Sequence, residues 1–161
     1  MQGGVARKLK GMEYRPFDEQ DFPAMEAFER ALLEGAPEHA YRAHPAALRF
    51  FMRTGHSFVA STRDAVHGFA LAQAVWQGDR PTVFVTRILA ADGAAYEGLL
   101  RAVVKSAYDA GVYEVAMHID PEHEALVAAA QAAGFTLGPL VLATRVLGSR
   151  GVRGETRHVL E

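Results

Sequence analysis

The chain has 161 residues, 50% of them hydrophobic, and a formal net charge of −2 at pH 7. This length fits one domain with one buried core, and the nearly balanced charge argues against a nucleic-acid partner held through its phosphates. The absence of cysteine excludes disulfides, iron–sulfur clusters, thiolate zinc sites and a cysteine nucleophile.

Other features of the composition bear on where the protein works. No apolar run approaches the ~18 residues that a membrane span needs, and the basic stretch 1–11 has no apolar segment behind it. We therefore expect a cytoplasmic protein without a membrane partner, and a loose basic leader over 1–11. Asparagine is absent and arginine far outnumbers lysine, a bias found both in thermophilic proteins and in GC-rich genomes.

The first third of the chain predicts one strand and two helices. "MEYRPF" at 12–17 is typical of a short opening strand. Asp21 is a suitable N-cap for a helix that runs to about Leu33, because apolar residues follow it at helical spacing. These apolar residues are Phe22, Met25, Phe28 and Leu32. A second helix is expected from about Pro45 to Gly55.

From His56 the apolar residues follow the period of a strand. "HSFVAST" at 56–62, "AVHGFALAQAVWQ" at 65–77 and "PTVFVTRILA" at 81–90 are three apolar runs joined by short polar turns. Tight turns between neighbouring strands predict an antiparallel meander.

A third helix and a further strand follow the meander. The helix presents an apolar face of Leu99, Leu100, Val103, Val104, Ala107 and Tyr108, and Gly111 ends it. "VYEVAMHID" at 112–120 is the next strand. The right-handed crossover rule places it parallel to the strand at 81–90.

The remaining sequence predicts a fourth helix and one or two strands. Asp120 and Pro121 are expected to be the N-cap and first residue of the helix, which Gly134 closes. Strands are expected within 135–147, and the polar residues 148–161 form a tail. The expected fold is one α/β domain over 12–147 with a mixed sheet, in the order β-α-α-β-β-β-α-β-α-β(β).

This order resembles the GNAT superfamily of acetyl-CoA-dependent N-acetyltransferases. The resemblance rests on "YRPFDEQDFPAM", "VHGFALA" and "YEVAMHIDPEHEALVAAAQAAGF". More narrowly, "FFMRTGHSF", "GFALAQAVWQG" and "GLLRAVVKSAYDAGVYEVA" resemble a small family of bacterial GNAT-like proteins of unknown function. The resemblance implies transfer of an acyl group from acetyl-CoA to a primary amine, while the function itself must be argued from the site.

The resemblance also implies where acetyl-CoA binds. In the superfamily the fourth and fifth strands part, the pantetheine arm pairs with the fourth strand, and the pyrophosphate lies on an Arg/Gln-x-x-Gly-x-Gly/Ala loop. Here the parting is expected near Ile88 and Val115. The residues matched to this site are Thr86, Arg87, Ile88, Leu89, Ala94, Ala95, Tyr96, Glu97, Gly98 and Arg101.

The loop departs from the superfamily pattern. Ala91 takes the place of the polar Arg/Gln anchor, and Tyr96 takes that of a small residue. Asp92 and Glu97 add negative charge where a pyrophosphate needs the opposite, although they suit a helix start on their own. Two interpretations stay open: residual acyl-CoA binding, with Arg87, Arg101 and Lys105 reaching a phosphate, or a turn that only connects a strand to a helix.

The catalytic residues are also incompletely matched. Ala130 stands where many members of the superfamily carry a tyrosine acid. Strand alternation places Glu114, His118 and Asp120 on one face, where Glu114 or His118 would accept the amine proton through water. The alternatives are an edge residue for Glu114, a half-buried side chain for His118 and a helix cap for Asp120.

Two hypotheses of function follow from these residues. The first is a GNAT-type N-acetyltransferase whose partners are an acyl-CoA and an amine. The second is a catalytically inactive binding or assembly module, formed as a homodimer. The seven histidines lack close paired spacing, so no metal site is expected under either hypothesis.

Overall fold

The computed structural model describes residues 11–35, 42–138 and 143. The elements within them are β1 (Glu13–Arg15), α1 (Phe22–Leu32), α2 (Pro45–Met52), β2 (Phe58–Ser61), β3 (Val66–Gln77), β4 (Arg80–Ala90), α3 (Gly93–Asp109), β5 (Glu114–Met117) and α4 (Glu124–Ala132). The leader at 1–10, most of the last expected strands and the polar tail lie outside the described residues.

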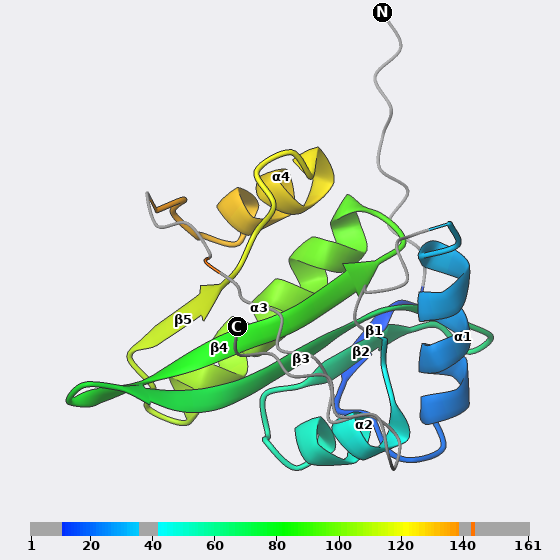
Figure 1. Ribbon diagram of the computed structural model, residues 1–161, viewed down its shortest axis with the longest axis horizontal. Helices are drawn as coiled ribbons and strands as arrows, with labels where there is room; N and C mark the ends of the chain where they lie inside the picture. Colours follow the sequence, from blue (N-terminus) through cyan, green and yellow to red (C-terminus); the bar gives the residue numbers. More distant parts are fainter. Residues whose placement is uncertain (1–10, 36–41, 139–142, 144–161) are drawn as a thin grey trace, which may run out of the picture.

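The described strands form one mixed sheet in the order β1-β2-β3-β4-β5. The meander from β2 to β4 is antiparallel, and β4 pairs with β5 in parallel, both as predicted from the short turns and the helical crossover. Figure 1 shows the long β3–β4 hairpin crossing the whole molecule. β5 is shorter than the strand expected over 112–120, because only Glu114–Met117 pair with β4.

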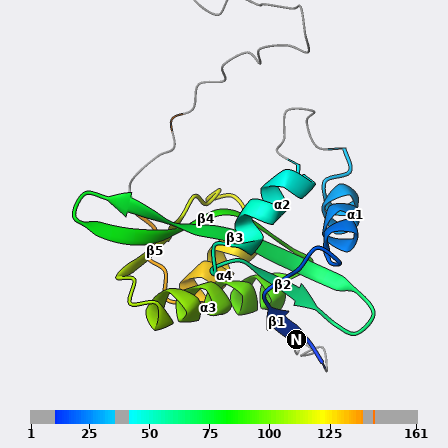
Figure 2. The ribbon, with the colours of Figure 1, turned by 90° about the horizontal axis from the view of Figure 1, so that it is seen from below.

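Helices cover both faces of this sheet. Figure 2 shows α1 and α2 on one face and α3 on the other. On the α3 face, Leu99, Leu100 and Val103 belong to the same buried cluster as Val83 and Val85 of β4. Complete burial of such a side chain contributes about 1.5–3 kcal/mol, so this face carries much of the core.

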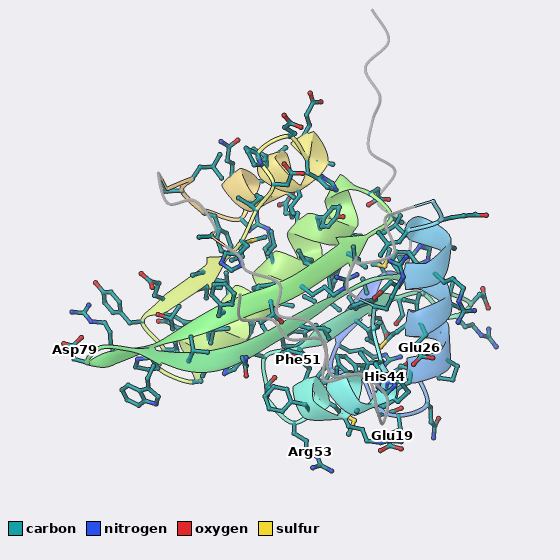
Figure 3. The ribbon with its side chains drawn as sticks, in the orientation of Figure 1. Glu19, Glu26, His44, Phe51, Arg53 and Asp79 are labelled. Carbon is teal, nitrogen blue, oxygen red and sulfur yellow. The ribbon has the colours of Figure 1, made fainter. Side chains whose placement is uncertain are left out.

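A second buried cluster lies under α1 and α2. Phe22 and Met25 of α1 and Leu48 of α2 pack with Phe69 and Leu71 of β3. Figure 3 shows Glu26 on α1 and Phe51 on α2, near one half of the sheet, while Asp79 marks the distant tip of the β3–β4 hairpin. The hairpin therefore extends beyond the helices of this face.

Three local expectations need correction. Asp21 precedes α1, but its side chain binds Arg15 through two hydrogen bonds of 2.7 and 2.8 Å and does not cap the helix. Tyr108 is 82% exposed, so it does not belong to the apolar face of α3. Leu32, the last residue of α1, is also exposed and does not belong to the buried apolar face of that helix.

The start of α4 differs more from the prediction. The helix begins at Glu124, and His123 caps it by accepting a hydrogen bond from the Leu126 N–H at Nδ1. Asp120 instead accepts from the Glu122 N–H, which forms a turn that delays the helix. The imidazole nitrogen thus takes the capping role expected of Asp120.

None of the described helices is long and apolar enough to cross a membrane.

Candidate functional site

An extra residue in β4 interrupts its pairing with β3. Leu71 pairs with Arg87 and the next residue, Ala72, pairs with Val85, so Thr86 has no opposite partner. The Thr86 hydroxyl donates to the Leu71 carbonyl oxygen at 3.1 Å. A bulge of this kind bends its strand and increases the local twist, so the direction of β4 changes at Thr86.

The pairing of β4 with β5 ends where the bulge begins. It joins Thr82–Val85 to Glu114–Met117, and the C-terminal part of β4, residues 86–90, has no partner on β5. The strands therefore part along Ile88, as expected. Val115 is paired with Val83, so the expectation that the strands part at Val115 is wrong. On β5 the parting lies beyond Met117.

The main chain of residues 86–90 leaves polar groups facing this opening. The Ala91 N–H donates to the His67 carbonyl oxygen at 2.8 Å on the β3 side. Alternate residues of an antiparallel strand direct their N–H and C=O groups to opposite edges. The main-chain groups of Ile88 and Ala90 therefore point away from β3, toward the opening.

A cleft of about 440 Å³ lies at this opening. It is formed by the ends of α1 and β4, the start of α3 and the start of α4. Its lining is Leu32, Leu33, Ile88, Leu89, Ala90, Ala91, Asp92, Tyr96, His123, Ala125 and Leu126. An apolar lining with a few directed polar groups is typical of a ligand site.

Tyr96 and His123 form the wall of the cleft nearest to α3. The Tyr96 side chain is buried, its ring meets the His123 ring edge-on with centroids 5.4 Å apart, and its hydroxyl lies 3.4 Å from His123 Nε2. Because Nδ1 of His123 accepts the capping bond, the neutral ring carries its proton on Nε2. Burial raises the pKa of Tyr96, and a backbone hydrogen bond with Ala90 lowers it by a smaller amount.

The start of α3 is capped by its own carboxylate. Oδ1 of Asp92 accepts from the Ala95 N–H at 2.9 Å, and the Asp92 carbonyl oxygen accepts from the Tyr96 N–H at 3.1 Å. Glu97 binds Arg101 at 2.7 Å, and Arg101 also donates to the Ala132 carbonyl oxygen at 3.0 Å. The acidic residues of this turn thus have partners within the protein.

The other small residues of the turn take part in packing. The Tyr14 hydroxyl donates to the Ala94 carbonyl oxygen at 3.2 Å, while Ala95 is buried in the α3 cluster. A Cβ atom on Gly98 would come within 2.0 Å of the Tyr14 ring. Gly98 is therefore a glycine that admits Tyr14 from β1.

Arg87 lies on the opposite face of β4, against α1. Its Nη2 is 3.1 Å from Oε1 of Glu29, which also accepts from the Ala43 N–H at 2.7 Å. Glu29 is 1% exposed, and sequence reasoning did not select it. Its spacing could have identified it, because Glu29 follows Phe22 and Met25 on the apolar face of α1.

The two candidate bases lie at opposite ends of the paired segment, Glu114 as the first residue of β5 and His118 just after its last residue. Val115, Met117 and Ile119 pack with the α3 cluster, so Glu114 and His118 point to the opposite face, as predicted. Oε1 of Glu114 accepts from the Thr82 hydroxyl at 3.0 Å within the paired half. His118 is the first residue beyond the last pair, with its ring edge-on to Phe84 at 4.8 Å between centroids.

Metal ligands do not gather in the described part of the chain: no three His, Asp or Glu side chains there lie close enough to hold an ion. The candidate site is the cleft, which His123 lines, together with His118, which lies outside the lining and just beyond the last β4–β5 pair.

Comparison with known proteins identifies a family and a fold. The model of a family described as "Protein of unknown function (DUF1999)" matches residues 12–159. The protein TTHA1254 from Thermus thermophilus is 55% identical, with a TM-score of 0.74 over 86% of this chain and 99% of that chain. No curated protein matches the chain.

More distant solved structures share the fold. Aminoglycoside N-acetyltransferase AAC(6′)-Iy, solved in complex with CoA, is 24% identical with a TM-score of 0.65, over 84% of this chain and 94% of that chain. A putative acetyltransferase from Agrobacterium tumefaciens is 17% identical with a TM-score of 0.67, over 83% of this chain and 99% of that chain. The mixed α/β fold is thus that of the GNAT acetyltransferases.

Proposed function

The chain belongs to the DUF1999 family of proteins of unknown function, and we propose that it is a GNAT-type N-acyltransferase. It takes an acyl group, most simply acetyl, from an acyl-CoA thioester and transfers it to a primary amine. One observation carries the proposal: the main-chain groups of Ile88 and Ala90 face a cleft at which β4 and β5 have parted.

This cleft suits the pantetheine arm of the donor. Pantetheine is a thin chain with two amides, and an unpaired strand edge offers the N–H and C=O groups that such amides need. Ile88 and Ala90 provide that edge, although the Ala90 main chain already makes a hydrogen bond with Tyr96. CoA is bound to AAC(6′)-Iy, a protein with the same fold.

The position of His118 favours it over Glu114 as the base. His118 follows the last β4–β5 pair, at the mouth of the opening, whereas Glu114 is bound to Thr82 at the far end of the pairing. A histidine titrates close to neutral pH and can take a proton from the attacking amine through one water. The nitrogen forms a bond to the thioester carbon, the carbon–sulfur bond breaks, and His118 holds the proton that the amine loses.

The first experiment measures the thermal stability of the protein with acetyl-CoA and with S-acetylpantetheine. A ligand at about 100 times its Kd adds about 2.7 kcal/mol to the free energy of unfolding, which raises the melting temperature. A rise with either thioester supports the proposal. No rise with either one, or with longer acyl chains, contradicts it.

Acyl transfer is then tested with a matched pair of variants. His118→Gln is expected to slow acetylation of an amine panel by about 10²-fold or more while leaving thioester binding unchanged. Glu114→Gln, at the other end of the same strand face, is the control and should leave the rate close to that of the wild type. Equal effects of the two variants would contradict the assignment of His118.

A second candidate function is a binding or assembly module without catalysis. It is favoured by Ala130, because the described part of α4 places no hydroxyl or thiol where a proton donor for the thiolate is expected. This module would bind the thioester without acylating any amine, and we propose a cytoplasmic homodimer for it. Size-exclusion chromatography with light scattering tests the dimer.

A further inference from the structure

We propose that the cleft binds only the pantetheine arm of its thioester donor, and that the diphosphate half of CoA finds no site at the start of α3. This inference rests on the proposed function and names its donor class. The donors are thioesters of pantetheine, whatever group stands beyond the pantetheine. Four features of the cleft support it.

The first feature is the charge of the lining. Asp92 is the only formally charged residue among the described residues that line the cleft. A helix start normally attracts anions through its N–H groups and its dipole. Here the Asp92 carboxylate already accepts from the Ala95 N–H, so a diphosphate at that donor would meet a like charge.

The second feature is the engagement of the nearby cations. Arg101, on α3, is bound to Glu97 and to the Ala132 carbonyl oxygen. Arg87, on β4, lies on the opposite face of the sheet against the buried Glu29. Arg87 would have to leave a buried carboxylate before it could bind a phosphate, and breaking a buried pair is costly. Arg101 would have to leave an exposed pair, which costs much less.

The third feature is the ring of Tyr96. The resemblance aligns this position with a small residue, and small residues let a diphosphate approach the backbone. Tyr96 is only 4% exposed, and its ring lies against His123 at the α3 end of the cleft. Its bulk stands where the diphosphate would have to approach.

The fourth feature is the polarity of the rest of the cleft lining. Its remaining lining is apolar apart from His123 and the main-chain groups of Ile88 and Ala90. These groups fit a neutral chain with amides. The cleft therefore suits the pantetheine arm and disfavours the anionic half of CoA.

The experiment compares the Kd of S-acetylpantetheine with that of acetyl-CoA by isothermal titration calorimetry. The wild type is expected to bind both within about threefold, because the diphosphate adds no favourable contact. Asp92→Ser removes the charge and keeps a good helix cap. It should tighten acetyl-CoA by about threefold or more and leave S-acetylpantetheine unchanged.

Asp109→Ser is the matched control, because it removes the same charge at the other end of α3. It should change neither Kd. Raising the salt concentration gives an independent readout. A diphosphate held by cations binds more weakly in high salt, whereas repulsion by Asp92 is screened, so acetyl-CoA should bind equally well or more tightly.

The inference is overturned if the wild type binds acetyl-CoA more than about tenfold more tightly than S-acetylpantetheine, since the diphosphate would then contribute about 1.4 kcal/mol. It is also overturned if Asp92→Ser weakens acetyl-CoA binding. Either result leaves the acyltransferase proposal standing. Failure of both thioesters to bind overturns the acyltransferase proposal, and this inference with it.

Discussion

The two halves of β4 have similar residues but differ in their pairing with β5. Residues 82–85 pair with β5, whereas residues 86–90 leave their β5 side open. Both halves are rich in apolar residues with a high preference for strands, so side-chain preference does not separate them. The single unpaired residue Thr86 separates the two halves, because the bulge turns the backbone of the second half away from β5.

The open half lacks β5 on one edge, but it is held by β3 on the other edge and by anchors on both faces. Arg87 is fastened to α1 through Glu29, and Ala90 packs in the cluster of α3. The comparison therefore teaches that the cleft is a product of backbone register and of anchors behind it. Changes to these anchors are expected to affect the open half first.

Glu29→Ala is expected to have the largest effect. It leaves Arg87 without its buried carboxylate partner and should lower the free energy of unfolding by about 3 kcal/mol. Urea denaturation measures this loss. Glu26→Ala on the same helix is the control and should cost less than about 1 kcal/mol. Equal losses would show that the pair does not anchor β4.

Gly98→Ala tests the contact between β1 and the start of α3. The new Cβ would overlap the Tyr14 ring, so we expect a loss of about 1–3 kcal/mol in the free energy of unfolding. In a Tyr14→Ala background the same change should become favourable by up to about 1 kcal/mol, since alanine stabilises a helix interior relative to glycine. A loss of the same size in both backgrounds would exclude steric overlap as the cause.

Thr86→Val tests the bulge itself. It removes the hydroxyl that donates to the Leu71 carbonyl oxygen, at an expected cost of about 1 kcal/mol. Amide hydrogen exchange should become faster in residues 86–90 and stay unchanged in residues 82–85. Thr136→Val, at an exposed position, is the control. Uniformly faster exchange along β4 would contradict a local role for Thr86.

The smallest expected effect is a dependence of the free energy of unfolding on pH, through His56. His56 Nδ1 contacts Ser106 Oγ at 3.0 Å, and burial lowers the pKa of His56 below its ordinary value of 6.5. The unfolded state then binds the proton first, so stability is full above pH 6.5 and falls as the pH drops through the folded pKa. The fall between pH 7 and pH 5 should be shallower in His56→Gln. Identical pH profiles would contradict this.

The sequence predicts the sheet better than it predicts the site. The meander and the parallel β5 follow from alternation, short turns and one helical crossover, all of which are local signals. The resemblance anticipates the opening at Ile88 on β4, but the bulge at Thr86 that produces it does not follow from the sequence, because it depends on the register of β3 against β4. For the same reason Val115, expected at the opening, is found paired.

Individual side chains of the site show the same limit. A glutamate on a helix is expected to be exposed, so Glu29 is found only when its place on the apolar face is weighed above its charge. His123 carries no sequence pattern that marks it as a site residue, yet its ring both caps α4 and touches Tyr96. Contacts between distant elements decide both cases, and no local pattern records them.

The central claim is that the open half of β4 binds a pantetheine thioester through its main chain. The most direct measurement is an NMR titration of the protein with S-acetylpantetheine, with backbone amides assigned. We expect the amide signals of Ile88 and Ala90 to shift and those of Val83 and Val85, which lie in the paired half, to stay in place. Shifts confined to the paired half, or no shift along β4 at saturating thioester, would contradict the account.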